Sequence, residues 1–189
     1  MRIFFPALVV CLFYINCQSV PDNHQHQQQG AKDTTAKKPL SPHTSTMAMV
    51  GDAHVHIDYS SPSVRGRVIW GGLVAYDKVW VSGAHNATSL ETNKALVIDN
   101  NVLPAGKYAL FTIPGKDNWT VIFNKNWDQH GADEYNGKED VFRVTVKPEI
   151  LPAIQEELLY EVKKESDKNG TISLSWEKIK ITFPFAVKE

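Results

Sequence analysis

The chain has 189 residues, enough for one domain with additional segments. Its composition, 42% hydrophobic and 22% charged, is ordinary for a globular protein. A formal net charge of −1 gives no electrostatic basis for binding nucleic acid or an anionic membrane surface. The two cysteines, Cys11 and Cys17, both lie in an N-terminal apolar segment, which excludes a disulfide or a thiolate metal site from the rest of the chain.

Residues 1–17 have the pattern of an export signal. Arg2 supplies a minimal positive region, and residues 3–15 are apolar but too few to span a bilayer comfortably. Cys17 ends the apolar run, where a bacterial lipoprotein signal places its lipidated cysteine, although the preceding residues are larger than usual. We expect a lipoprotein of the cell envelope, outer-membrane or periplasmic, that meets the membrane only through its lipid anchor. A plain secretory signal or an uncleaved anchor are the alternatives.

Residues 18–39 are polar and low in sequence complexity, and they contain no apolar periodicity. They predict a disordered linker with a reach of roughly 26 Å. His24 and His26 fall in this segment and could bind a metal ion, but a solvated linker is the simpler interpretation.

From residue 40 to residue 189 the pattern changes to short β-strands separated by turn residues. Residues 53–59 alternate strictly, with Val55 and Ile57 on one face and His54 and His56 on the other. The remaining short strands or apolar runs are expected at 67–70, 78–82, 88–92, 94–98, 107–113, 119–124, 141–146, 154–164, 171–176 and 178–183.

The densest apolar sequence predicts an antiparallel hairpin made by residues 107–113 and 119–124. Both faces of the first strand are apolar, so it should be buried on both sides. Pro114-Gly115 suits a type II turn between the strands. The residues expected at the centre of the core are Leu110, Phe111, Val121 and Phe123.

Only residues 154–164 suggest a helix, and their leucine, tyrosine and valine content also suits a strand. Strand is favoured because every neighbouring element is a strand. We therefore expect an all-β domain, an antiparallel β-sandwich or jelly roll with little or no helix outside the signal segment.

Long ordered motifs in this domain resemble a known family. They are SPH at 41–43, YSSPSVRGRVIWGGLVAYDKVW at 59–80, LPAGKYALFTIPGKDNWTVIFNKNW at 103–127, DVFRVTVKP at 140–148 and LSWEKIKITFP at 174–184. Residues 40–189 are similar to the bacterial domain of unknown function 2911, which is typical of Bacteroidetes envelope proteins. The resemblance implies an extracytoplasmic β-rich domain and no established activity.

The chain departs from the pattern of that family at one group of positions. The family commonly has arginine where this chain has Ser61 and Val81, and Asn-Glu where this chain has His85 and Asn86. Joint loss of charges of both signs suggests that these positions face one another in one polar pocket, because losing one partner of a buried ion pair is costly. Independent drift on a solvated surface is the alternative.

Histidines offer one possible chemistry. His54 and His56 lie on one strand face, roughly 6.6 Å apart along it, which suits zinc if a third ligand such as Asp58, His85 or His130 completes the site. Alternating polar residues are equally typical of a solvated strand face. No sequence motif of a known hydrolase or phosphate-binding loop is present.

Two further groups are candidate ligand-binding residues. Arg65 and Arg67 share a face and could clamp a carboxylate or phosphate, or else cap the start of a strand. Trp127 and His130 lie in a polar loop that is either a binding loop or an ordered connector.

We favour a non-enzymatic envelope module, without cofactor, that binds a small ligand, a glycan or a protein. The alternative is a metal-dependent hydrolase that uses the surface histidines. The two hypotheses differ in the metal content of the purified domain.

Overall fold

The computed structural model describes Met1 and residues 39–188. Residues 2–38, which include almost all of the expected signal segment, the expected lipidation site Cys17 and nearly all of the polar linker, lie outside the described residues. Within the described part, the only helix is a single 3-10 turn, η1 (Gly137–Glu139), and no helix there has the length and apolar character needed to cross a membrane.

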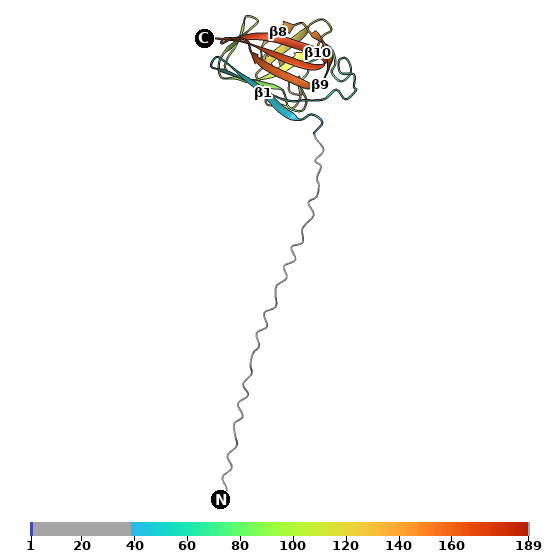
Figure 1. Ribbon diagram of the computed structural model, residues 1–189, viewed down its shortest axis with the longest axis vertical. Coiled ribbons are helices and arrows are strands. Elements are labelled where there is room, and N and C mark those ends of the chain that lie inside the picture. The colour runs from blue at the N-terminus through green and yellow to red at the C-terminus, as the bar shows by residue number, and fades with distance from the viewer. Residues whose placement is uncertain (2–38, 189) are drawn as a thin grey trace. The chain divides into compact units, whose positions relative to one another are not determined.

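Two antiparallel sheets form the folded part (Figure 1). The six-stranded sheet contains, in spatial order, β1 (His43–Val50), β2 (Ala53–Ser60), β3 (Ser89–Thr92), β6 (Gly106–Ile113), β7 (Trp119–Asn124) and β8 (Asp140–Val146). The four-stranded sheet contains β5 (Asn101–Leu103), β4 (Leu96–Ile98), β10 (Asn169–Val187) and β9 (Glu149–Lys164). The predicted all-β class is confirmed, and two open sheets that share one core are the arrangement of a β-sandwich.

The main core consists of the inward residues of both sheets. On β2, Val55 and Ile57 are fully buried whereas His54 and His56 lie on the other face and are half-buried, as the alternation predicts. The four-stranded sheet contributes Leu158, Tyr160 and Leu174 among others, all buried in the same cluster. One apolar core therefore holds the two sheets together.

The central hairpin follows the prediction closely. Its strands are β6 and β7, and Leu110, Phe111, Val121 and Phe123 are at most 1% exposed. Phe111 belongs to a second, smaller apolar cluster with Ala87, Ala109 and Ile122 on the outer face of the sheet. The partly buried side chains that cover this cluster include Val79, Val81, Ala132 and Tyr135, which belong to loops. Loops thus bury the second face of β6.

Two expected strands before β3 are absent. Residues 67–70 lie in a series of turns, in which Gly72 and Val74 donate backbone hydrogen bonds to Ile69. Gly71 has φ +78°, a left-handed conformation that suits glycine and turns the chain back. At 78–82 a single bridge from Trp80 to Thr112 replaces the expected strand.

Other boundaries also differ. Strands β1 and β5 were not expected, and Pro152 lies inside β9, where an edge position makes its missing N–H tolerable. The expected strands 171–176 and 178–183 form one strand, β10, interrupted by an irregularity at Glu177, which has φ +54°. Gly115 does not have positive φ, so the expected type II turn is wrong.

Candidate functional site

Residues 61–88 leave the six-stranded sheet after β2 and return to it at β3. Two contacts with β9 fix the first part: Val64 N–H donates to the Glu156 carbonyl (2.8 Å), and Leu158 N–H donates to the Pro62 carbonyl (2.9 Å). The later part is held by Trp80 and Thr112, whose backbones exchange two hydrogen bonds of 2.8 and 3.0 Å. The segment is thus attached to both sheets.

A cleft lies along this segment. Its volume is about 260 Å³, and its lining includes Arg65, Arg67, Trp80, Gly83 and Trp176. We call it the Arg–Trp cleft. It brings together the two predicted arginines and two tryptophans from residues 96 positions apart (80 to 176).

The tryptophans form a rigid wall. The rings of Trp80 and Trp176 stack with centroids 5.8 Å apart and an interplanar angle of 16°. Trp70 meets both edge-on, at 5.7 and 5.8 Å, and it also contacts Trp119 at 4.8 Å. Such aromatic pairs add about 0.5–1.5 kcal/mol each to the area they bury. Trp176 is 1% exposed, whereas Trp80 is only half-buried and offers part of its surface.

Hydrogen bonds hold both arginines in place and leave guanidinium N–H groups available to bind a ligand. Arg67 donates from Nε to the Val64 carbonyl (3.1 Å) and from Nη2 to the Ser63 carbonyl (2.5 Å), and its other guanidinium N–H groups remain for a ligand. Arg65 donates from its backbone N–H to Glu156 Oε1 (2.8 Å), while its side chain is exposed. No carboxylate belongs to the lining of the cleft.

Two indole N–H groups near the arginines have unmet hydrogen-bonding capacity. Nε1 of Trp176, which lines the cleft, and Nε1 of Trp70 are buried without a hydrogen-bond partner among the described residues. A buried donor without a partner costs about 1–3 kcal/mol. Because Nε1 of Trp176 is itself buried, it is not exposed to a ligand in the cleft.

Strained backbone surrounds the same cleft. Arg65, Ser82 and Glu177 have φ of 50°, 57° and 54°, and the last two directly adjoin the lining residues Gly83 and Trp176. Left-handed conformations cost non-glycine residues about 1–3 kcal/mol and cluster at functional sites. Ser82 is held in place by two donors to its carbonyl, Tyr160 Oη (3.1 Å) and Thr88 Oγ1 (3.1 Å).

Burial changes the pKa of Tyr160, one of the two residues that hold Ser82. It raises the pKa of Tyr160 far above the usual tyrosine range, although the side chains of Ser82 and Thr88 act in the opposite direction. Tyr160 therefore stays neutral at physiological pH and keeps the proton that it donates to the Ser82 carbonyl.

The predicted residues His85, Asn86 and His130 come together in a second place. Gly131 N–H donates to the His85 carbonyl (2.6 Å), and Asn86 forms a bridge with His130. His85 and Asn86 line a pocket of about 110 Å³ with His43 and Asp58, whose Nε2 and Oδ1 are 2.6 Å apart. His43 was not predicted, although the SPH motif at 41–43 contains it.

The structure places the positions of the hypothesised polar pocket in three different surroundings. Ser61 Oγ donates to the Leu158 carbonyl (2.6 Å), and Val81 packs on the outer apolar cluster. His85 and Asn86 line the small histidine pocket. Ser61 also lines a pocket that shares His43 and Tyr59 with the histidine pocket, whereas Val81 lines neither, so one pocket for all four positions stays a prediction.

The remaining predicted residues lie elsewhere. Trp127 is 39% exposed, and Lys107 Nζ lies 4.2 Å from its ring centroid. His54 and His56 project from β2 with ring centroids 5.9 Å apart. Among residues 39–188 no group of three or more His, Cys, Asp or Glu side chains is close enough to hold a metal ion.

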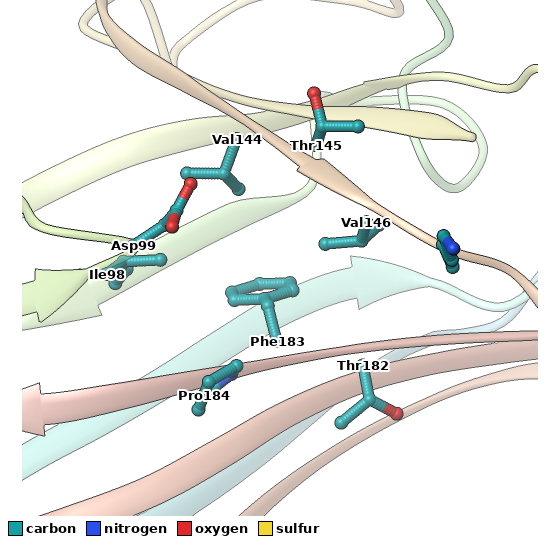
Figure 2. Close-up of a pocket in the computed structure, with 9 residues that line it drawn as sticks. Ile98, Asp99, Val144, Thr145, Val146, Thr182, Phe183 and Pro184 are labelled. Atoms are coloured by element: carbon teal, nitrogen blue, oxygen red, sulfur yellow. The ribbon is translucent and has the colours of Figure 1, made fainter.

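A second cleft lies at the end of the sandwich where β8 approaches β10 (Figure 2). Its volume is about 230 Å³, and Figure 2 shows Phe183 and Val146 pointing into it, with Asp99 at one side. Its lining combines apolar residues with Asp99, Thr145, Lys147 and Thr182, whereas the Arg–Trp cleft joins two guanidinium groups to an indole wall. The Arg–Trp cleft is therefore the stronger candidate for specific recognition.

Sequence reasoning proposed the two arginines but missed Trp80, Trp176 and Gly83, which line the same cleft. A ligand-binding tryptophan and a core tryptophan have the same strand pattern. A Cβ on Gly83 would lie 2.8 Å from Thr88 Oγ1 and 3.1 Å from the Ser60 carbonyl oxygen, so only glycine fits there. No local signal distinguishes this requirement from an ordinary loop glycine.

Comparisons with known proteins agree with the sequence motifs. No curated protein matches the chain. No solved structure matches it either. The family model described as Protein of unknown function (DUF2911) matches residues 41–185, which include the whole Arg–Trp cleft. The chain therefore belongs to the DUF2911 family.

Proposed function

We propose that this protein is a non-enzymatic, lipid-anchored module of the cell envelope that binds a small acidic ligand in the Arg–Trp cleft. The observation that carries the proposal is the placement of Arg65 and Arg67 beside Trp80 and Trp176 in one cleft of about 260 Å³.

The chemistry of the cleft suits a carboxylate attached to a saturated ring, as in an acidic sugar. A guanidinium presents a planar fork of donors that matches a carboxylate. The half-buried indole of Trp80 offers an apolar surface for the C–H face of the ring.

Binding is favoured over catalysis because of what lines the cleft. None of its lining residues is a His, Asp, Glu or Cys, so it contains no group suited to general acid–base chemistry near neutral pH. The histidines near His85 lie in a different pocket and are not needed for this proposal.

Tryptophan fluorescence tests the ligand class. Titration of the full chain with D-glucuronate should change the emission, whereas D-glucose, which lacks the carboxylate, should bind at least about tenfold more weakly. Arg65→Gln should abolish this difference. Lys147→Gln, which removes a charge beside the second cleft, is the matched control and should leave it unchanged. Equal responses to both sugars would contradict the proposal.

Anchoring is tested separately at Cys17, which the structure does not describe. Labelling of cells with a radioactive fatty acid should mark the wild-type protein and not Cys17→Ser. Equal labelling of the two, or a mature N-terminus at another residue, would contradict the lipoprotein assignment and support plain secretion.

A further inference from the structure

The outer face of the β1–β2 hairpin carries two methionines opposite two histidines. In the antiparallel register, Met47 pairs with His56 and Met49 pairs with His54. Directly paired residues on one face have Cβ atoms about 4.5–5.5 Å apart. Met-x-Met and His-x-His therefore form one compact patch of four side chains, away from the Arg–Trp cleft.

Donor atoms already converge in this patch. His54 Nε2 lies 3.2 Å from Met47 Sδ, across the diagonal of the four residues. The imidazoles of His54 and His56 stack with centroids 5.9 Å apart. Two ligands of one tetrahedral ion, at bond lengths of about 2.0 and 2.3 Å, lie about 3.5 Å apart. Small rotamer changes would place one ion between the thioethers and the imidazoles.

The methionines are also accessible to an ion. Met47 is 61% exposed and Met49 is 50% exposed, whereas the histidines beside them are half-buried. Long apolar side chains on an exposed edge strand gain little from burial. The two methionines therefore contribute little to packing, but they lie beside two imidazoles, where they could bind an ion.

The donor set selects the metal. Zinc prefers thiolate, imidazole and carboxylate ligands, and the described residues contain no group of three His, Cys, Asp or Glu that could hold an ion. Thioether sulfur is a soft ligand that selects monovalent copper, which also accepts imidazole. We propose that Met47, Met49, His54 and His56 bind one Cu(I) ion. Silver(I), which has the same charge and softness, should bind at the same place.

Methionine methyl NMR provides a direct test on the full chain. The chain contains only three methionines, Met1, Met47 and Met49, so selective ¹³C-methyl labelling gives at most three signals. The two thiols are first blocked with iodoacetamide so that they do not compete for metal. Titration with Ag(I) should shift two methyl signals, with saturation at one ion per patch. Unmoved signals for Met47 and Met49 would overturn the proposal.

Affinity measurements separate the roles of the ligands. In competition with bicinchoninate for Cu(I), Met47→Leu with Met49→Leu should weaken binding by at least about 100-fold, since even outer-shell partners commonly account for 10–100-fold. Both positions are exposed, so the fold should be retained, which circular dichroism checks. Wild-type affinity in this double variant would overturn the proposal.

A matched histidine control comes from the same chain. His54→Gln with His56→Gln should reduce Cu(I) affinity to a similar extent, whereas His24→Asn with His26→Asn removes an identical His-x-His spacing and should leave the site intact. If only the second pair of changes reduces binding, the ion is held by residues 24 and 26 and the proposal fails.

Discussion

The β6–β7 hairpin and residues 61–88 are held in place by different kinds of interaction. In the hairpin, alternate residues of two adjacent strands point into two apolar clusters, and the register from Ala109–Asn124 to Ile113–Thr120 is continuous. In residues 61–88 there is no strand, and order comes from hydrogen bonds to β6 and β9 and from the wall of tryptophans. The hairpin is stabilised by its own pattern, whereas the segment depends on distant residues.

That difference explains where the candidate sites are. Residues in the hairpin are committed to packing on both faces, so none of them is a recognition group in the Arg–Trp cleft. The segment holds its side chains by backbone contacts, which leaves guanidinium and indole groups partly free. Binding residues are commonly carried on loops that a rigid scaffold positions.

The largest expected effect lies in the hairpin. Phe111→Ala should lower the free energy of unfolding by about 3–5 kcal/mol, because Phe111 is fully buried and truncation leaves a cavity. Urea denaturation measures the change. Val68→Ala in the segment is the control and should change stability by less than about 0.5 kcal/mol, since Val68 is 74% exposed. A loss below about 1 kcal/mol for Phe111→Ala would break the comparison.

A smaller effect is expected where the segment returns to the sheet. Gly83→Ala should cost about 1–3 kcal/mol, because the new Cβ would crowd Thr88 Oγ1 at 2.8 Å. It should also weaken ligand binding in the Arg–Trp cleft, which Gly83 lines. Gly137→Ala is the matched control, with its nearest contact at 3.4 Å to the end of the Arg143 side chain. Equal stability of the two variants would show that residues near Gly83 can move to accommodate the added methyl group.

Tyr160→Phe sharpens the comparison by removing a single anchor. The variant loses the hydrogen bond to the Ser82 carbonyl, at a cost of about 0.5–1.5 kcal/mol, while Thr88 still donates to that carbonyl. Chemical denaturation at neutral pH measures this loss. Tyr76→Phe, at a half-buried residue on the same segment, should cost less. A larger cost for Tyr76→Phe would contradict the role of Tyr160.

The same residue makes stability depend on alkaline pH. Burial raises the pKa of Tyr160 in the folded state, so the unfolded state loses its proton first as pH rises. Its contribution is complete below about pH 10, the ordinary tyrosine pKa, and is lost progressively above it. Wild type should therefore lose more stability than Tyr160→Phe between about pH 9.5 and pH 11. Parallel profiles would show that Tyr160 is not the responsible group.

The smallest effect joins the hairpin to a loop. Lys107 on β6 lies over the ring of Trp127, and both groups are at least partly exposed. A double-mutant cycle with Lys107→Met and Trp127→Leu should give a coupling of about 0.5–1 kcal/mol, typical of an exposed cation–π pair. A coupling energy of zero would show that the Lys107–Trp127 contact does not stabilise the fold.

Sequence reasoning succeeded where a structure depends on nearby residues. The alternation in β2 and the two-sided apolar pattern of β6 require only the strand period of two, and both were predicted correctly. The segment 67–82 was wrongly predicted to contain strands, because its apolar residues pack against Trp119 and Trp176 from distant strands. Arg65 and Arg67 line the same cleft although the strand on which they were paired is absent, and their tryptophan partners come from long-range contacts that no spacing rule encodes.

Strand β10 has a consequence for how the chain is made. It lies between β4 and β9, and its last residues, Ala186 and Val187, pair with Val97 and Leu96. Synthesis delivers a chain from its N-terminus, so β4 and β9 are made before their shared partner. A nonsense mutation before residue 169 would leave β9 without its strand partner, β4 paired only with β5, and the inner face of the six-stranded sheet partly uncovered. Such a product should be degraded by proteases, and the intact chain should fold slowly, as domains rich in distant strand pairings do.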